Sequence, residues 1–422
     1  SIGHWNLWAD AKLKILAFNA YYEPEKAASI YLPQNIYEGF AEHGWDTVLF
    51  VPVPTRGVSG ETRKYYQKHR KEVRVNGNLQ ITRMRLYREG RNPVLRAMRY
   101  VLMNAMFLLK SVHTSADVVF VQSTPPTQGA MAALIKKIKK IPFVYNLQDV
   151  FPDSMVNAGM TRKGSLLWIM GEKLERFTYR NADKIIVISK NMKRLLLDKG
   201  VPEEKIEVVY NWVESEKVVP INRKDNYLFD ECGLDRDKFY VVYAGNLGQA
   251  QNIDIILEAA KLLEGNSEIE FLIFGEGVLQ EKYRMKAQQE RQRNISFHDL
   301  LPYDQVSYVY SLGDAGIVSC KEGFGGSALP SKTWSIMAAA SVVVASFDEH
   351  TDMQDIIENN KIGIFCRAGD AAQLAEAIIK LHENADMRTS MGREARRYVK
   401  EQMCREHGVS EYIRIMESVS KG

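Results

Sequence analysis

A glycine-rich loop bracketed by two lysines is the part of this sequence best suited to bind an anion. The loop comprises residues 323–327 (GFGGS), with Lys321 before it and Lys332 after it. Its backbone N–H groups, the positive end of the helix expected to follow and two ammonium groups can together hold a phosphate. Glu322 ends the preceding apolar strand, where a carboxylate can accept hydrogen bonds from sugar hydroxyls. A solvated loop with surface lysines is the alternative interpretation.

A second glycine turn lies upstream, between an expected strand (FYVVYA) and an expected helix that begins at Asn252. Its residues are Gly245, Asn246, Leu247 and Gly248. Such a turn exposes N–H groups to a phosphate, although glycines also serve simply to join a strand to a helix. The G-x-G-x-x-G spacing of the dinucleotide fingerprint is missing, and the first strand carries no glycine loop, so a dehydrogenase is disfavoured.

Positive charge is concentrated in one region of a chain whose net charge is only +4. Residues 56–99 hold thirteen Lys or Arg against three Glu, so the rest of the chain sums to −6. Residues 91–111 then predict a helix that carries Arg91, Arg96 and Arg99 in its first turns and is almost entirely apolar beyond them. The helix is too short and too charged to span a membrane, and it fits a helix that lies on anionic lipid.

Lys136 and Lys137 belong to a second basic cluster in the same half of the chain. We expect both basic segments to contact an anionic membrane surface or an acceptor. A buried core helix with solvated arginines is the alternative. Nucleic acid is not expected as a partner, because no recognised nucleic-acid-binding motif accompanies the charge.

Runs of β-branched and apolar residues alternate with helical patterns along the whole chain, which indicates parallel α/β sheets. The expected strands are Lys12–Asn19, Trp45–Val53, Asp117–Gln122, Pro142–Gln148, Lys184–Ser189, Phe239–Ala244, Ile269–Phe274, Ile295–His298, Ala315–Ser319 and Val342–Ser346. The expected helices besides residues 91–111 are Ala27–His43, Asn252–Leu263, Ser331–Ala340, Ala371–Asn384 and Met387–Met416.

The length of 422 residues suits two such domains. The segments expected are a leader or tag remnant (1–11), an N-terminal Rossmann-like domain (12–212), a polar linker (213–237), a C-terminal Rossmann-like domain (238–395) and a C-terminal helix packing back toward the N-terminal domain (396–422). In such sheets ligands bind beyond the carboxyl ends of the strands. The four cysteines are widely spaced and the histidines form no H-E-x-x-H or H-x-H pair, so neither disulfides nor a metal are expected.

The order of these elements and several segments resemble the retaining family 4 of the GT-B glycosyltransferases over nearly the whole chain. The segments that carry the resemblance are NAYYEPEKAAS, NLQDVFPDS, ADKIIVIS, VVYNWVE, VVYAGNLGQAQNID, FLIFGEG and, most specifically, EGFGGSALPSKTWSIMAAA. Within the family the chain looks most similar to bacterial transferases that build O-antigen or capsule repeat units, such as the L-fucosamine transferase type. The implied fold is GT-B, two Rossmann-like doubly wound parallel-sheet domains with an interdomain cleft.

The resemblance also implies roles for individual residues. Glu322 matches the glutamate that binds the donor sugar, and Asp149 falls where the family places a polar residue facing the reacting sugar. The residues implied to bind the rest of the donor are Asn246, Gly248, Gly275, Glu276, Asp299, Leu300, Lys321, Phe324, Gly325, Gly326, Lys332 and Ser335.

The chain departs from the family pattern at three places. The second glutamate, which usually holds the ribose, is replaced by Pro330, or by Ser335 if the helix is aligned instead. The Arg and Lys that often flank the phosphates are Asn246 and Gln251, so we expect Lys332, with Lys321, to supply the charge. Gln148 stands where many relatives have histidine, which leaves the acid–base roles beside Asp149 open.

The resemblance therefore implies a retaining, metal-independent glycosyltransferase without a cofactor. It would move a sugar, an N-acetylated or deoxyamino hexose, from a UDP-sugar to a lipid-linked (polyprenyl-diphosphate) glycan in surface polysaccharide synthesis. It would work in the cytoplasm as a peripheral protein on the inner face of the cell membrane. The alternatives are a GT-B UDP-sugar epimerase and a non-catalytic nucleotide-sugar-binding subunit.

Overall fold

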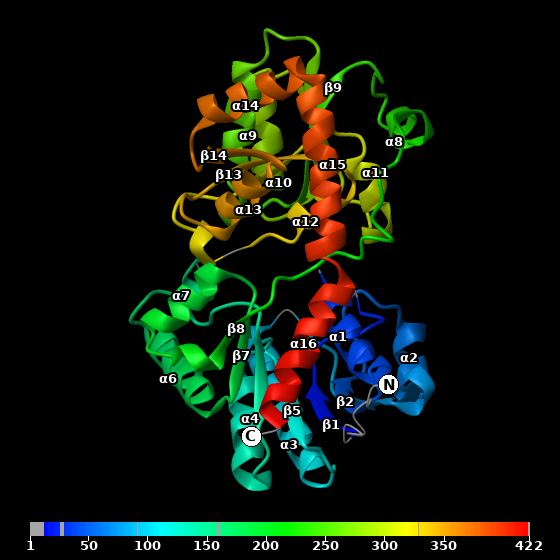
Figure 1. Cartoon of the computed structure of the whole chain (residues 1–422), viewed down its shortest axis with the longest axis vertical. Coiled ribbons are helices and arrows are strands. Elements are labelled where there is room, and N and C mark those ends of the chain that lie inside the picture. Colours follow the sequence, from blue (N-terminus) through cyan, green and yellow to red (C-terminus); the bar gives the residue numbers. More distant parts are fainter. Residues whose placement is uncertain (1–11, 26–28, 91, 158–160, 328, 421–422) are drawn as a thin grey trace, which may run out of the picture.

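The computed structural model describes residues 12–25, 29–90, 92–157, 161–327 and 329–420. The leader 1–11 and Arg91 lie outside the described residues. Two α/β domains follow each other along the long axis of the molecule, with the N-terminal domain below the C-terminal domain in Figure 1. Each domain has its own sheet with helices on both faces.

The sheet of the N-terminal domain is built from β1 (Lys14–Phe18), β2 (Asp46–Pro52), β3 (Lys71–Arg74), β4 (Leu79–Met84), β5 (Val118–Gln122), β6 (Phe143–Leu147), β7 (Lys184–Val187) and β8 (Ile206–Val208). The strand order is β3-β4-β2-β1-β5-β6-β7-β8. All neighbours are parallel except β3 and β4. The central strands are continuous apolar runs because a parallel sheet is buried on both faces.

The helices of this domain are α1 (Tyr31–Glu42), α2 (Gly60–Lys68), α3 (Pro93–Val112), α4 (Thr127–Lys139), α5 (Asp153–Asn157), α6 (Leu166–Asn181) and α7 (Lys190–Asp198), joined by the C-terminal α16 (Arg405–Ser420). Successive residues of a strand point to opposite faces. Leu16 of β1 therefore shares a core with Phe107 of α3 and Met131 of α4. Ile15 shares a second core, on the other face, with Tyr412 of α16.

The sheet of the C-terminal domain consists of β9 (Phe239–Asn246), β10 (Ile269–Glu276), β11 (Ile295–His298), β12 (Ala315–Ser319), β13 (Val342–Phe347) and β14 (Gly363–Arg367). The order is β11-β10-β9-β12-β13-β14, and all neighbours are parallel. The order reverses between β9 and β12, and beyond these two strands the N–H of Lys321 donates to the carbonyl of Ala250 over 2.9 Å. This switch point brings the two glycine loops of the sequence to the same edge of the sheet.

The helices around this second sheet are α8 (Leu228–Glu231), α9 (Ile253–Leu262), α10 (Gln280–Gln289), α11 (Val306–Tyr310), α12 (Lys332–Ala338), α13 (Asp352–Asn360), α14 (Ala371–Glu383) and α15 (Ala385–Gln402). Residues 213–237 were expected to be a polar linker. Leu228 and Phe229 are instead buried in the core with Tyr240 of β9. The linker therefore packs on the C-terminal domain, because its few apolar side chains find a core there.

The prediction of one helix over Met387–Met416 is wrong. The chain breaks between α15 and α16, where the N–H of Val213 donates to the carbonyl of Met403 over 3.1 Å. After the break, α16 crosses to the N-terminal domain and contacts α1 (Figure 1). β3, β4, β8 and β14 were not expected from the sequence, because charged residues in β3 and the brevity of β8 obscure the strand pattern.

Candidate donor site between the two domains

The two glycine turns of the C-terminal domain pack against each other beyond β9 and β10. The pairing of these strands continues to Gly245 opposite Gly275 and to Asn246 opposite Glu276. A Cβ on Gly275 would lie 2.7 Å from the carbonyl oxygen of Gly245, so this approach requires glycine. A Cβ on Gly248 would lie 2.9 Å from Nδ2 of Asn246. Four of the predicted donor residues thus adjoin one another.

Lys332, at the start of α12, brings an ammonium group to the first of these turns. Its Nζ atom is shielded from solvent and has no hydrogen-bond partner among the described residues. The atom lies 3.8 Å from the ring centroid of Tyr243 and 2.9 Å from the position of a Cβ on Gly245. Burial lowers the pKa of Lys332 to about 7, because the charged form loses its water. An anion beside Gly245 would supply the missing partner.

The loop after β12 is held by a carboxylate that sequence reasoning missed. Asp348 accepts the N–H of Gly323 at Oδ1 over 3.0 Å and the N–H of Gly325 at Oδ2 over 2.7 Å. The N–H of Gly325, which the resemblance assigns to the donor, is therefore engaged within the loop. Phe324 and Gly326 are partly exposed. The position of Asp348 directly after β13 was the available signal, since site residues cluster at the carboxyl ends of strands.

Glu322 and Lys321 differ from Lys332 in their exposure to solvent. Both are exposed, and Glu322 lines an open cavity of about 560 Å³ with Arg367 and Asp370. Within the described part of the chain, no hydrogen bond or ion pair joins either residue to Lys332. The structure therefore separates the buried cation from the exposed carboxylate, and a ligand that touches both has to extend along the loop between them.

The residues expected beside the nucleoside occupy the end of β11. Asp299 and Leu300 are exposed, and Asp299 has Arg284 at 3.6 Å. The preceding His298 stacks on Phe274 with ring centroids 4.7 Å apart. Burial, together with the charge of Arg284, lowers the pKa of His298. The edge thus combines exposed polar groups with the partly exposed ring of His298, which the buried Phe274 supports from behind and on which a base can stack.

Ser335 lies in the core and not on the surface of this site. It is 8% exposed, and its neighbours Trp334 and Ile336 are fully buried. The reason is that α12 presents almost every one of its residues to the core of the domain. Neither Ser335 nor Pro330 offers a carboxylate, so the ribose-binding glutamate of the family has no counterpart at these positions.

In the N-terminal domain a polar network supports the segment after β6. Gln148 accepts the amide of Asn211 over 2.8 Å and donates to Oδ1 of Asn146 over 2.9 Å. Asn146 is buried and also accepts the hydroxyl of Tyr412 over 3.0 Å. The network ties the end of β6 to α16, so Gln148 acts as a fixed amide in place of the family's histidine.

Asp149 follows this network and is exposed at the same sheet edge. Neighbouring atoms keep water away from its carboxyl group, and this loss of solvation raises the pKa of Asp149 above the ordinary value of 3.8. Hydrogen bonds from Ser154 and Val150 oppose the rise. It forms no ion pair with any residue that the structure describes. A carboxyl group in such surroundings can accept a hydrogen bond from a substrate hydroxyl.

Direct contacts join the two domains. The side chain and backbone of Asn191 exchange hydrogen bonds with Asp352, over 2.9 and 2.7 Å. Tyr210 donates its hydroxyl to Oδ1 of Asp352 over 2.6 Å. The rings of Tyr31 and Tyr303 stack with centroids 5.3 Å apart. These contacts hold the carboxyl ends of the two sheets toward each other.

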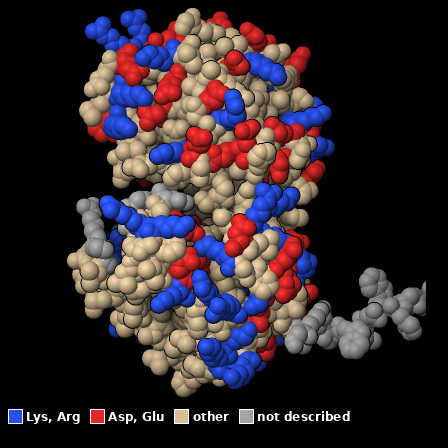
Figure 2. Space-filling model, turned by 90° about the vertical axis from the view of Figure 1, so that its left-hand side faces the viewer, with Lys and Arg blue, Asp and Glu red and all other residues tan. Residues whose placement is uncertain are grey.

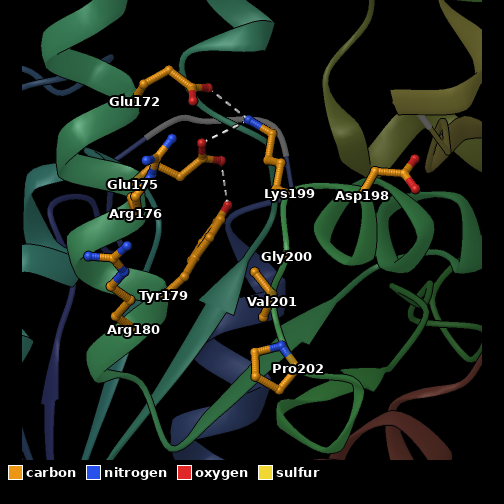
Figure 3. A pocket seen from close by; sticks show the side chains of 10 residues that line it. All are labelled: Glu172, Glu175, Arg176, Tyr179, Arg180, Asp198, Lys199, Gly200, Val201 and Pro202. Carbon is orange, nitrogen blue, oxygen red and sulfur yellow. Dashed lines mark hydrogen bonds and ion pairs between the residues drawn. The ribbon is translucent and has the colours of Figure 1, made fainter.

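A separate cavity of about 420 Å³ lies in the N-terminal domain between α6 and the segment after α7 (Figure 3). Lys199 reaches across it to Glu172 at 3.0 Å and Glu175 at 2.8 Å, and Tyr179 donates to Glu175 over 2.7 Å. Burial raises the pKa of Glu175 to about 7, and Lys199 opposes the rise. The charged and hydroxyl groups around the cavity are therefore paired with one another. We interpret them as a structural ion network that is separate from the donor site.

The basic residues expected on the membrane are only partly at the surface. Arg99 is 2% exposed, because the inward face of α3 repeats through Arg99, Met103 and Phe107. Placing Arg99 on a lipid-facing surface is therefore wrong. Arg96 remains half-exposed and lies 3.5 Å from Glu89.

The second basic cluster is also engaged in part. Lys136 forms an ion pair with Asp183 over 2.7 Å and is thus a structural residue in this structure. Lys137 is exposed, with Nζ 4.9 Å from the ring centroid of Phe177. Figure 2 shows many Lys and Arg side chains on the N-terminal domain, the lower one in this view.

Most of the large side chains that α3 exposes to solvent are apolar. Its large exposed apolar residues are Val94, Leu95, Met98, Val101, Leu102, Leu109 and Val112. Adjacent helices of the same layer add Leu134 and Ile138 on α4 and Leu166, Leu167, Ile169 and Met170 on α6. We call the seven residues of α3 the apolar stripe. None of the helices within the described residues has the length and apolar character that crossing a membrane requires.

Comparison with known proteins identifies both domains. The family described as glycosyl transferase 4-like domain matches residues 31–212, and the family described as glycosyl transferases group 1 matches residues 226–398. The chain is 27% identical over 267 residues to the probable glycosyltransferase WbjE of Pseudomonas aeruginosa, covering 63% of this chain and 66% of WbjE. It is 28% identical over 228 residues to WcaI of Escherichia coli K12, a putative colanic acid biosynthesis glycosyl transferase, covering 53% of this chain and 56% of WcaI. These matches thus span less than two thirds of either relative.

A solved structure supports the architecture. HepE of Anabaena in complex with UDP superposes with a TM-score of 0.70 at 13% identity, covering 96% of this chain and 100% of HepE. At this identity the likeness shows the fold alone. The predicted GT-B fold, with two parallel-sheet α/β domains, is confirmed, and so is the prediction of a transferase. The chain belongs to the GT-B glycosyltransferases that combine a glycosyl transferase 4-like domain with a group 1 domain.

Proposed function

We propose that this glycosyltransferase transfers a sugar, an N-acetylated or deoxyamino hexose, from a UDP-sugar to a lipid-linked glycan with retention and without a metal. The observation that carries the proposal is the buried ammonium of Lys332, which has no anion among the described residues and lies against the Gly245 turn. A diphosphate bound there would give the buried ammonium group a counter-ion and hydrogen-bond acceptors, and would so offset the cost of burying its charge. UDP in the HepE complex supports a uridine nucleotide as the donor.

The chemical task is to stabilise a leaving diphosphate while positive charge develops at the anomeric carbon. Lys332 would hold the diphosphate, and Glu322 would bind donor hydroxyls farther along the loop. In a cleft that excludes water, a cation fixed before the reaction stabilises the developing negative charge strongly. Asp149, from the opposite domain, would orient the accepting hydroxyl. In a front-face reaction the departing phosphate accepts the proton, so no strong side-chain base is needed.

The acceptor and the cellular location that we propose are argued from the surface of the N-terminal domain. The apolar stripe of α3, together with exposed apolar residues on α4 and α6, forms a face suited to a membrane interface. The name of one relative, WcaI, includes colanic acid biosynthesis, which supports a role in surface polysaccharide synthesis. We therefore place the enzyme at the cytoplasmic face of the cell membrane, with a polyprenyl-diphosphate glycan as the acceptor.

The decisive experiment measures release of nucleoside diphosphate by the full chain from a panel of UDP-, GDP- and ADP-sugars. It is run with and without lipid-linked acceptors and with EDTA. We expect release from a UDP-sugar, stimulated by the acceptor and unchanged by EDTA, and a product with the anomeric configuration of the donor. A GT-B epimerase would yield free sugar or an epimer without an acceptor. Binding without any release would favour a non-catalytic subunit.

A further inference from the structure

The N-terminal domain buries an arginine for which the described residues provide no partner. Arg99 is 2% exposed, and its Nε atom is buried without a hydrogen-bond acceptor. No ion pair or hydrogen bond joins Arg99 to any residue in the described ranges. Arg83, buried to a similar degree, differs in having a counter-ion: its Nη2 atom pairs with Glu72 over 3.2 Å and donates to the carbonyl of Glu23 over 2.8 Å, although its Nε and Nη1 atoms have no partner among the described residues. A buried guanidinium without such partners is strongly unfavourable unless an anion accompanies it.

Two further arginines lie near Arg99. Arg63 donates to the carbonyl of Pro54 and to that of Leu86, each over 2.9 Å, so it bridges the segments that follow β2 and β4. Burial lowers the pKa of Arg63, and the charges of Arg99 and Arg88 lower it further. The geometry agrees with this: Leu86, whose carbonyl Arg63 binds, shares a core with Met103 of α3, one turn beyond Arg99, and Arg88 follows Leu86 by two residues.

The nearby carboxylates are already engaged by other groups. Glu25 accepts the N–H of Thr55 over 2.6 Å and that of Arg56 over 3.0 Å. Glu89 pairs with Arg56 over 3.1 Å and with Arg96 over 3.5 Å. Glu25 offsets only part of the repulsion at Arg63, whose pKa still falls. The cluster therefore keeps a local excess of positive charge.

We propose that Arg63, Arg88 and Arg99 bind the diphosphate group of the lipid-linked acceptor. The proposal rests on the function proposed above and names the place where this acceptor is held. Arg99 lies in α3 between Met98 and Leu102 of the apolar stripe. A lipid diphosphate held by the arginines would thus have its lipid chain beside the apolar stripe. Two N–H groups of a guanidinium can donate to two oxygens of one phosphate.

The sheet also sets the distance to the reacting end of the acceptor. Arg63 lies beyond β2 and β4, whereas Asp149 follows β6, three and four strands away. At a strand spacing of about 4.8 Å this separation is on the order of 14–19 Å. The glycan between the diphosphate and the accepting hydroxyl has to cover it. The proposal therefore favours an acceptor with more than one sugar.

The test measures binding of farnesyl diphosphate to the full chain in a Lys332→Met background, so that the donor site contributes no anion binding. Arg99→Met should weaken binding at least tenfold while the Tm stays equal or rises, because the substitution removes an unpaired buried charge. Arg88→Gln, at an exposed position, should also weaken binding and keeps the test valid if Arg99→Met fails to fold. The matched control, Arg83→Met, should lower the Tm because it breaks a paired buried arginine.

Farnesol and dihexanoyl phosphatidylglycerol identify the source of the anion. Farnesol should bind weakly and equally to the parent and to Arg99→Met, and the phospholipid should not displace farnesyl diphosphate. Displacement by the phospholipid at similar concentration would make this a headgroup site and overturn the proposal. Unchanged farnesyl diphosphate binding by Arg88→Gln and Arg99→Met would overturn it as well. Failure of the proposed function would appear separately, as absence of acceptor-stimulated UDP release by the parent chain.

Discussion

Replacing Lys332 by methionine should make the protein more stable and less active at the same time. Burial lowers the pKa of Lys332 from 10.5 to about 7. At about 1.4 kcal/mol per unit, holding this ammonium in the folded protein costs on the order of 4–5 kcal/mol at pH 7. Methionine fills a similar volume without charge. Even half of this cost would raise the Tm of the ligand-free protein by several degrees.

The sign of the pH dependence follows from the lowered pKa. Below pH 7 the full cost is present, and it disappears as pH rises toward 10.5, since the unfolded chain then also loses the proton. The difference in Tm between Lys332→Met and the parent should therefore be largest at or below pH 7, be reduced by about half at pH 9 and vanish only near pH 10.5. UDP binding by the parent should take up a proton at pH 8 and weaken as pH rises, whereas the variant should show neither effect.

Activity should change in the opposite direction. Loss of a cation that stabilises a leaving diphosphate costs roughly 3 kcal/mol, which corresponds to a fall in kcat of two orders of magnitude or more. Lys224→Met, at an exposed lysine of the linker, is the matched control and should leave both Tm and turnover unchanged. Parent-like turnover with a parent-like Tm in Lys332→Met would refute the reasoning, because it would mean that the ammonium is neither strained nor used.

Three further predictions concern other parts of the molecule. Glu322→Gln should slow both transfer and donor hydrolysis, because the carboxylate is proposed to hold donor hydroxyls; loss of transfer with intact hydrolysis would assign it to the acceptor. Val101→Glu combined with Leu109→Glu changes two side chains that are 66% and 69% exposed, so the fold should persist while sedimentation with anionic vesicles falls sharply; unchanged sedimentation would remove the apolar stripe from the interface. Burial raises the pKa of Glu175 to about 7, so the folded protein is stabilised by protonation of this carboxyl group and loses that stability as pH rises from 4.5 through 7. Glutamine stays neutral, so the Tm of Glu175→Gln relative to the parent should increase between pH 5 and pH 8. A constant difference in Tm would contradict the raised pKa.

The alternation of apolar strands and helices was sufficient to predict both sheets and most of their strands. The exceptions have local causes. In β3 the charged Lys71, Glu72 and Arg74 flank the lone Val73, so the segment carries no apolar run. The break between α15 and α16 was hidden because Met403 and Cys404 continue a helical pattern, and only the contact of Met403 with Val213 in the fold shows where the chain turns.

Within the candidate site, motif and position predicted that the glycine turns lie at the carboxyl edge of the sheet and singled out Lys332, but they did not predict its burial. Burial depends on Tyr243 and Gly245, which come from a strand far away in the sequence. The prediction that Arg99 faces lipid was wrong. A helix with arginines in its first turns looks the same in sequence whether these arginines face lipid or the core. Asp348 was missed because no glycine or lysine pattern marked the end of β13.

The two cations whose environment the sequence could not predict share one physical property. Lys332 and Arg99 are each shielded from water, and neither has an anionic partner among the described residues. Each therefore lowers the stability of the ligand-free protein. Arg83, which pairs with Glu72, shows that the same fold can place a carboxylate beside a buried arginine. One lies in the C-terminal domain, beside the turn expected to hold the donor, and the other in the N-terminal domain, on the helix expected to meet the lipid. A glycosyl transfer between a nucleotide-sugar and a lipid-diphosphate glycan presents two diphosphates, one to each domain. On this view the two unsatisfied charges are the parts of the two domains that the substrates complete, and stability is given up at these positions for binding.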